Sequence, residues 1–163
     1  MATIDTSKNT QQTLELCEQI EQCNAEIYNH FAKLFADSPD MAALWHKTAM
    51  EEENHAQQFT LAIKLQNLKV VENVTIDRIK ADTVLSHVKS IYDNALAGNP
   101  SKLQALTAAL KLEEKLAEFH ANAVAVFVDD AYRNLFTAMM RADKEHVETL
   151  QKAYNKLTAN NAG

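Results

Sequence analysis

A short polar stretch, Glu51-Glu52-Glu53-Asn54-His55, lies inside a run with the apolar spacing of a helix, over residues 41–68. On a helical wheel Glu52 and His55 fall on the inner face, among apolar residues. Burying a carboxylate and an imidazole costs free energy unless a partner compensates. The same two side chains, three residues apart on an inward helix face, are what a metal ion requires in the core of a helical bundle.

The sequence contains an internal repeat of one helical hairpin. When Glu21 is aligned with Glu113, the two halves stay in register with a gap of one residue. Each half then carries an acidic residue on its first helix, and an acidic residue and a histidine three apart on its second. The aligned pairs are Glu21 with Glu113, Tyr28 with His120, Glu52 with Asp143, and His55 with His146.

These aligned residues predict a binuclear metal site. Four carboxylates and two imidazoles in one core would be strongly destabilising without cations, because each buried unpaired charge costs several kcal/mol. Two divalent ions would compensate. Oxygen-rich ligand sets with one nitrogen per ion favour iron or manganese, and the absence of thiolate ligands argues against structural zinc. Carboxylate bridges between such ions suit reactions with dioxygen or peroxide.

The helices that must position these residues follow from the apolar spacing. A long helix is expected from Thr10 until Asp37-Ser38-Pro39-Asp40, where capping residues and a proline mark a new helix start. Residues 68–82 lose the helical pattern, and fully extended they would reach roughly 50 Å, enough for a crossover along a whole bundle. The predicted segments are a frayed terminus over 1–9, a bundle domain over 10–158 with helices at about 10–36, 41–67, 83–97, 101–128 and 130–158, and a flexible end over 159–163.

The composition supports an all-α fold and limits the partners. The chain has 163 residues, 47% of them hydrophobic, with only two glycines and two prolines. Its net charge of −6 and the lack of a basic run argue against nucleic acid and anionic membranes. No signal sequence or membrane span is evident, so we expect a cytoplasmic protein. Cys17 and Cys23 are six residues apart and are interpreted as ordinary thiols.

The motifs resemble those of the ferritin-like di-iron carboxylate proteins, and most closely those of the rubrerythrin branch. Glu21 is followed seven residues later by Tyr28, as in the first helix of that branch, and Glu52-Glu53-Asn54-His55-Ala56 is similar to its second-helix motif. The resemblance covers about residues 10–158. It implies a four-helix bundle with a long connection between the second and third helices and a short extra helix before the third.

The resemblance also implies a function and a ligand set. We expect two iron ions, with manganese or a mixed pair as alternatives, and reaction with peroxide, dioxygen or ferrous iron as a peroxidase or ferroxidase. Tyr28 is expected to be a catalytic residue that hydrogen-bonds a ligand carboxylate; the alternative is a buried aromatic residue of the core whose hydroxyl is satisfied. No rubredoxin-like Cys-x-x-Cys segment follows residue 158, so an external electron-donor protein is expected, and a homodimer is compatible with the long helices. The predicted metal ligands are Glu21, Glu52, His55, Glu113, Asp143 and His146.

Some assignments stay open at the level of sequence. Glu114 competes with Glu113 for the third-helix position, and His120 is either a further ligand or a donor to one. Asp143 is one methylene shorter than the glutamate usual at its position. Glu51 and Glu53 are interpreted as a solvated face, although Glu51 lies close to the inner stripe. The rival hypothesis is a helical metal-binding or interaction protein without redox turnover.

Overall fold

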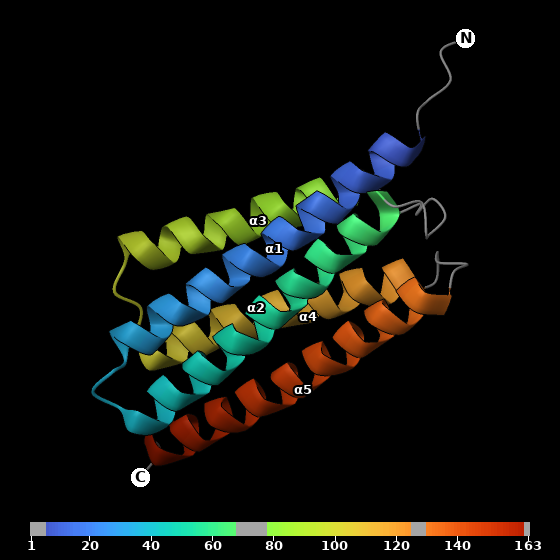
Figure 1. The fold of residues 1–163 in the computed structure, drawn as a ribbon. Coiled ribbons are helices and arrows are strands. Elements are labelled where there is room, and N and C mark those ends of the chain that lie inside the picture. The colour runs from blue at the N-terminus through green and yellow to red at the C-terminus, as the bar shows by residue number, and fades with distance from the viewer. Residues whose placement is uncertain (1–5, 68–77, 125–129, 162–163) are drawn as a thin grey trace.

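The predicted all-α architecture is confirmed. The computed structural model describes residues 6–67, 78–124 and 130–161, and the described residues form helices without a strand (Figure 1). The helices are α1 (Thr6–Leu34), α2 (Pro39–Asn67), α3 (Arg78–Ala97), α4 (Lys102–Val124) and α5 (Asp130–Asn161).

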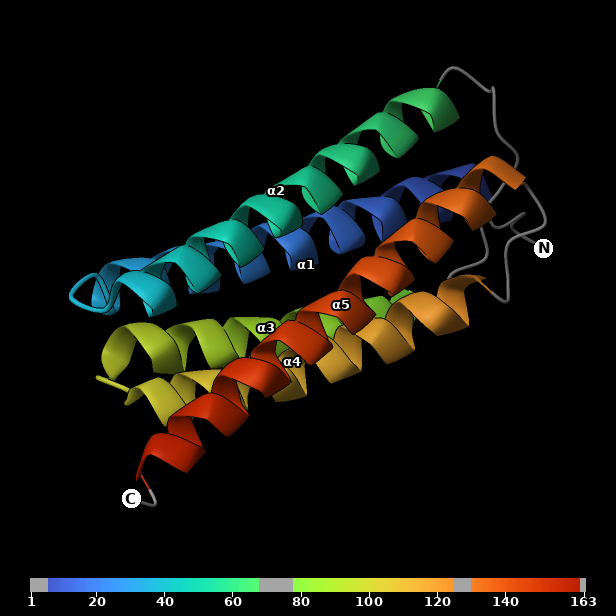
Figure 2. The same ribbon diagram turned by 90° about the horizontal axis from the view of Figure 1, so that it is seen from below.

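The bundle is built from two antiparallel hairpins, α1 with α2 and α4 with α5, as the internal repeat predicts. Figure 1 and Figure 2 show that α2 and α4 run in the same direction, so the chain must return along the bundle between them. The described part of that return is α3, which packs along α1. The four helices that carry the predicted site residues therefore surround a common core.

The connection between the hairpins differs from the sequence prediction. Residues 68–82 were expected to be extended. Residues 68–77 lie outside the described residues, and α3 begins at Arg78, five residues before the expected start. The prediction was wrong over 78–82. Ala81 is buried together with Val84, Leu85 and Val88, so the first turn of α3 packs against α1 as a helix. Twenty residues of helix span about 30 Å, so α3 covers much of the bundle's length.

Other helix ends lie close to their predicted positions. α1 begins at Thr6 rather than Thr10, and α5 ends three residues beyond the predicted 158. The predicted end of the third bundle helix at residue 128 lies outside the described residues.

Two local signals start the helices of the hairpins. Pro39 is the first residue of α2, where its fixed backbone angle suits the helix and its missing N–H costs nothing. Before α4, Ser101 and Gln104 form a capping box: the Gln104 backbone N–H donates to the Ser101 hydroxyl at 3.1 Å, and the Ser101 N–H donates to the Gln104 side chain at 2.9 Å.

The core around the polar residues is aromatic and aliphatic. Trp45 is fully buried, and its ring stacks on Tyr28 with 5.5 Å between centroids and contacts Phe31 at 5.0 Å. Other fully buried side chains include Phe59, Leu106, Leu112, Leu116 and Met139. Close packing on this scale holds neighbouring polar side chains in fixed positions.

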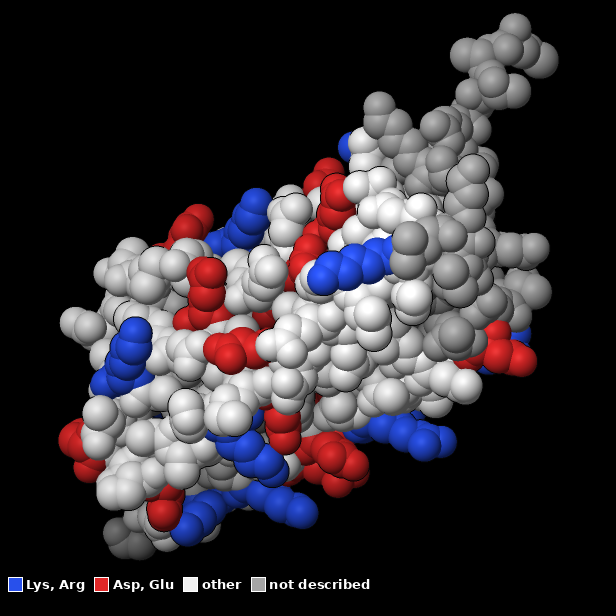
Figure 3. Space-filling view, in the orientation of Figure 1, with Lys and Arg blue, Asp and Glu red and all other residues white. Residues whose placement is uncertain are grey.

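The surface shown in Figure 3 carries interspersed acidic and basic side chains. Within the described residues, none of the helices has the length and apolar character needed to cross a membrane.

Candidate metal centre

Six polar side chains meet between the helices of the bundle, at inner positions where the spacing would otherwise place apolar residues. Each is at most 6% exposed. They come from α1 (Glu21), α2 (Glu52 and His55), α4 (Glu113) and α5 (Asp143 and His146). All six predicted ligands are therefore in the core.

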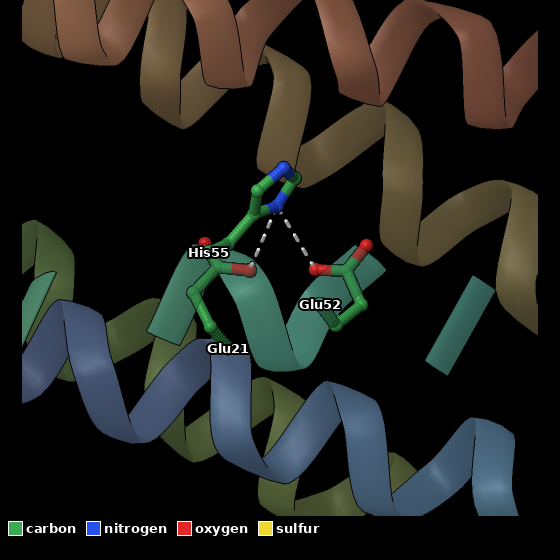
Figure 4. A group of neighbouring side chains, drawn as sticks. All are labelled: Glu21, Glu52 and His55. Carbon is green, nitrogen blue, oxygen red and sulfur yellow. Dashed lines mark ion pairs between the residues drawn. The ribbon is translucent and has the colours of Figure 1, made fainter. Parts of the chain in front are cut away.

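Glu21, Glu52 and His55 form a first set of donor atoms, named group one. One donor atom from each residue lies within 4.8 Å of the others. Nδ1 of His55 lies 3.4 Å from Oε2 of Glu52 and 3.8 Å from Oε2 of Glu21. Figure 4 shows these side chains reaching toward one another from α1 and α2. Two carboxylates and an imidazole in this arrangement could hold one metal ion.

Glu52, Glu113 and His146 form a second set, named group two, in which one donor atom from each residue also lies within 4.8 Å of the others. Nδ1 of His146 lies 3.0 Å from Oε1 of Glu52 and 3.3 Å from Oε2 of Glu113. Glu52 therefore belongs to both groups, with Oε2 toward His55 and Oε1 toward His146. A carboxylate placed in this way could bridge two ions.

Tyr28 supports the carboxylate that α4 contributes. Its hydroxyl is buried and donates a hydrogen bond to Oε1 of Glu113, to which the side-chain amide of Asn24 also donates at 3.4 Å. Burial and the charge of Glu113 raise the pKa of Tyr28 well above its usual value, so the phenol keeps its proton. The structure selects Glu113 over Glu114, because Glu114 is exposed.

The model of the rubrerythrin family matches residues 13–154, a range that includes all six side chains. The chain belongs to the rubrerythrin family. No curated protein and no solved structure matches it. In this member of the rubrerythrin family, two buried donor groups that share Glu52 point to a dinuclear metal site.

The α5 position of this rubrerythrin-family site carries the aspartate noted in the sequence. Asp143 is buried but belongs to neither donor group. Its Oδ2 lies 2.5 Å from Nδ1 of His120, whose Nε2 lies 3.0 Å from Oε1 of Glu21. His120, whose role was left open by the sequence, therefore lies between the carboxylates of Asp143 and Glu21.

The donor chemistry of this rubrerythrin-family chain fits a pair of divalent ions. Both oxygens of Glu52 are buried, and no N–H or O–H of the described residues reaches them with hydrogen-bond geometry. Oxygens of this kind are costly to bury without a cation. With one imidazole in each group, the set matches the preferences of iron and manganese.

His55 and Glu21 hold one another in their charged forms. Burial would lower the pKa of His55, but contacts with Glu21 and Glu52 outweigh burial and raise it to about 10. Burial would raise the pKa of Glu21, but the nearby imidazoles of His120 and His55 lower it to about 2. A metal ion that takes the lone pair of His55 must therefore displace a proton.

One residue of the centre was missed by sequence reasoning. Oε2 of Glu51 lies 2.6 Å from Nε2 of His146, although Glu51 was assigned to the solvated face. That assignment holds in part: the side chain is 38% exposed, but it reaches from the edge of the inner stripe of α2 to His146 on α5. The signal available in the sequence was its wheel position beside that stripe.

Proposed function

We propose that this protein is a di-iron oxidoreductase that reduces hydrogen peroxide or dioxygen. The observation that supports the proposal is the position of Glu52, whose two oxygens face two buried groups, each completed by a further glutamate and a histidine. Glu21, Glu52 and His55 would hold one ion and Glu52, Glu113 and His146 the other, so the pair could supply two electrons to a single small oxidant. Hydrogen peroxide, dioxygen and ferrous iron are the proposed small-molecule partners.

Reduction of one molecule of hydrogen peroxide to two molecules of water takes two electrons and two protons, and two ferrous ions, if bound, would supply one electron each. The chain contributes a core in which Glu21, Glu52 and Glu113 are fully buried. Low exposure keeps bulk water from competing for these carboxylates. The Tyr28 hydroxyl donates to Oε1 of Glu113, and Oε2 of Glu113 faces His146 within group two.

Repeated turnover requires electrons from outside this site, and we propose an external electron-donor protein as their source. Cys17 and Cys23 are free thiols on α1, and they lack the Cys-x-x-Cys spacing of a rubredoxin-like centre. When ferrous iron is itself the substrate and leaves after oxidation, the same residues give a ferroxidase. The peroxidase and the ferroxidase differ in whether iron stays bound after oxidation.

The experiment is anaerobic loading of the protein with Fe²⁺, followed by rapid mixing with hydrogen peroxide or with oxygenated buffer. We expect two irons per chain and growth of the near-ultraviolet absorption of a carboxylate-bridged ferric pair. Comparing the two oxidants at equal concentration identifies the preferred one. Release of ferric iron after a single oxidation distinguishes the ferroxidase from the peroxidase.

The matched variants are Glu52→Gln and Glu53→Gln, neighbours on α2 that are buried and exposed respectively. E52Q keeps the shape of the shared side chain but removes its charge, and should lose both iron binding and the absorption. E53Q should behave as the wild type. A folded wild-type protein that takes up no iron, or whose bound ferrous iron reacts with neither oxidant, would contradict the proposal and favour a helical protein without redox turnover.

A further inference from the structure

We infer that Glu51 is a positioning residue for His146 and that it makes group two the tighter of two unequal metal positions. This inference rests on the proposed binding of two ions. It concerns the order in which the positions fill, which the family assignment does not specify.

The contacts of His146 divide between its two ring nitrogens. Nε2 lies 2.6 Å from Oε2 of Glu51, while Nδ1 lies 3.0 Å from Oε1 of Glu52 and 3.3 Å from Oε2 of Glu113. When Nε2–H donates to Glu51, the lone pair of Nδ1 points at the donor atoms of group two. A carboxylate behind a histidine fixes the ring orientation and the tautomer, and increases the basicity of the coordinating nitrogen.

The internal repeat shows that this support is present on one side of the centre. The residue that aligns with Glu51 is Ala142, which immediately precedes Asp143. A methyl group cannot accept a hydrogen bond, so His55 receives no such contact from the position equivalent to Glu51.

The glutamates of the two groups do not remove this difference, because each is held by a side chain of the other hairpin, and Glu113 also accepts a hydrogen bond from Asn24. Glu113 has one oxygen held by Tyr28 and the other directed at group two. Glu21 has one oxygen 3.0 Å from His120 and the other directed at His55 in group one. The difference between the two positions that acts through a histidine is therefore the contact of Glu51 with His146.

Glu51 is also a residue that can be replaced without disturbing the core. Its side chain is 38% exposed and lies 3.8 Å from the exposed Lys47. Truncating it removes little packing, so a change in metal binding would report the contact with His146 rather than a change in fold.

The test uses Co²⁺ as the probe, added under argon to the metal-free full-length protein and followed by calorimetry and visible absorption. We expect two binding steps in the wild type. Glu51→Ala should weaken the tighter step by about 10- to 100-fold, the range found when such a partner is removed, and leave the weaker step unchanged. Glu51→Gln, whose amide oxygen still accepts from Nε2–H, should restore most of the affinity and the cobalt spectrum.

Two further variants assign the steps. Glu53→Ala alters the exposed neighbour, which accepts a hydrogen bond from Asn29 at 3.0 Å, and should match the wild type. His55→Ala should abolish the weaker step and keep the tighter one sensitive to Glu51→Ala.

The outcomes separate this inference from the proposed function. Two bound ions whose affinities do not change in E51A would overturn the inference and leave the di-iron proposal standing, as would an E51A effect on the step that His55→Ala removes. A folded wild type that binds no Co²⁺ and no Fe²⁺ would overturn both.

Discussion

Tyr28 on α1 donates a hydrogen bond to Glu113 on α4, across the boundary between the two hairpins. The internal repeat aligns Tyr28 with His120 and Glu113 with Glu21. His120 and Glu21 make the reciprocal contact, with 3.0 Å between His120 Nε2 and Glu21 Oε1. Each half of the chain thus holds a carboxylate of the other half. The duplication in the sequence is preserved as an approximate twofold relation at the centre.

Replacing Tyr28 by phenylalanine removes the donor to Glu113 without removing the ring that stacks on Trp45. We expect the oxidation of bound ferrous iron to slow by about tenfold, because the carboxylate loses its orientation, while two irons still bind. Stopped-flow absorption after mixing with peroxide measures the rate. Tyr154→Phe, on α5 and half-buried, is the control. An unchanged rate in Y28F would contradict a role for the hydroxyl.

Divalent ions should stabilise the folded protein, since the donor groups exist in the native state and not in the unfolded chain. Fe²⁺ at 100 times its dissociation constant should add about 2.7 kcal/mol to the free energy of unfolding. Anaerobic thermal denaturation, with and without a chelator, measures the effect. Glu52→Gln should show no metal-dependent increase, and a wild type that melts at the same temperature with and without metal would exclude this linkage.

The stability of the metal-free protein should depend on pH in opposite directions on its acid and alkaline sides. The pKa of Glu21 is lowered from 4.5 to about 2, so its contribution is present above pH 4.5 and is lost as the pH falls toward 2. The pKa values of His55 and His146 are raised from 6.5 to about 10 and about 11, so their contribution is present below pH 6.5 and is lost as the pH rises through 10 and 11.

Urea denaturation of the metal-free protein between pH 3 and pH 11 checks this dependence. Bound metal needs neutral histidines and releases their protons, so the extra stability given by metal should grow as the pH rises from 6.5. A metal-free protein whose stability stays constant from pH 6.5 to 11 would show that these histidines are not held charged by their carboxylates.

Asp143→Asn tests whether the α5 aspartate is needed for metal. Because Asp143 belongs to neither donor group and contacts His120 at 2.5 Å, we expect the variant still to bind two ions. Loss of a buried charged hydrogen bond should lower the stability of the metal-free protein by roughly 1.5–3 kcal/mol. Metal analysis and urea denaturation give the two values. A stoichiometry of one ion would instead identify Asp143 as a ligand.

The two thiols should differ in reactivity. Cys17 is buried, and burial together with Glu21 raises its pKa, so it should react with a disulfide reagent only after unfolding. Cys23 is half-buried, and burial raises its pKa to about 11, so it should react slowly at pH 8 and faster as the pH increases. Cys23→Ser assigns the slow phase. Rapid labelling of Cys17 in the folded Cys23→Ser variant would contradict its buried position.

The six central residues could be predicted because the signal is local to each helix. Glu52 and His55 stand out on the inner stripe of α2, and the repeat carries the same reasoning to Asp143 and His146. Periodicity also located the helices, since an apolar stripe requires something to pack against. Which residues are buried was thus accessible from spacing alone.

The contacts between the two hairpins could not be predicted from spacing. The reach of Glu51 to His146, and the position of His120 between Glu21 and Asp143, depend on how far apart α1, α2, α4 and α5 lie. Spacing along one helix does not encode that separation. The start of α3 was missed for a related reason: Arg78, Ile79 and Lys80 are exposed, so the first turn of α3 carries little of the apolar stripe.

The two donor groups differ in what they connect. Group one lies within the first hairpin, since Glu21, Glu52 and His55 come from α1 and α2, whereas group two joins Glu52 of α2 to Glu113 of α4 and His146 of α5. An ion in group two is therefore a tertiary cross-link between segments far apart in the chain, and it reduces the conformational entropy of any opened state. Occupancy of that one position would couple assembly of the whole molecule to the supply of metal.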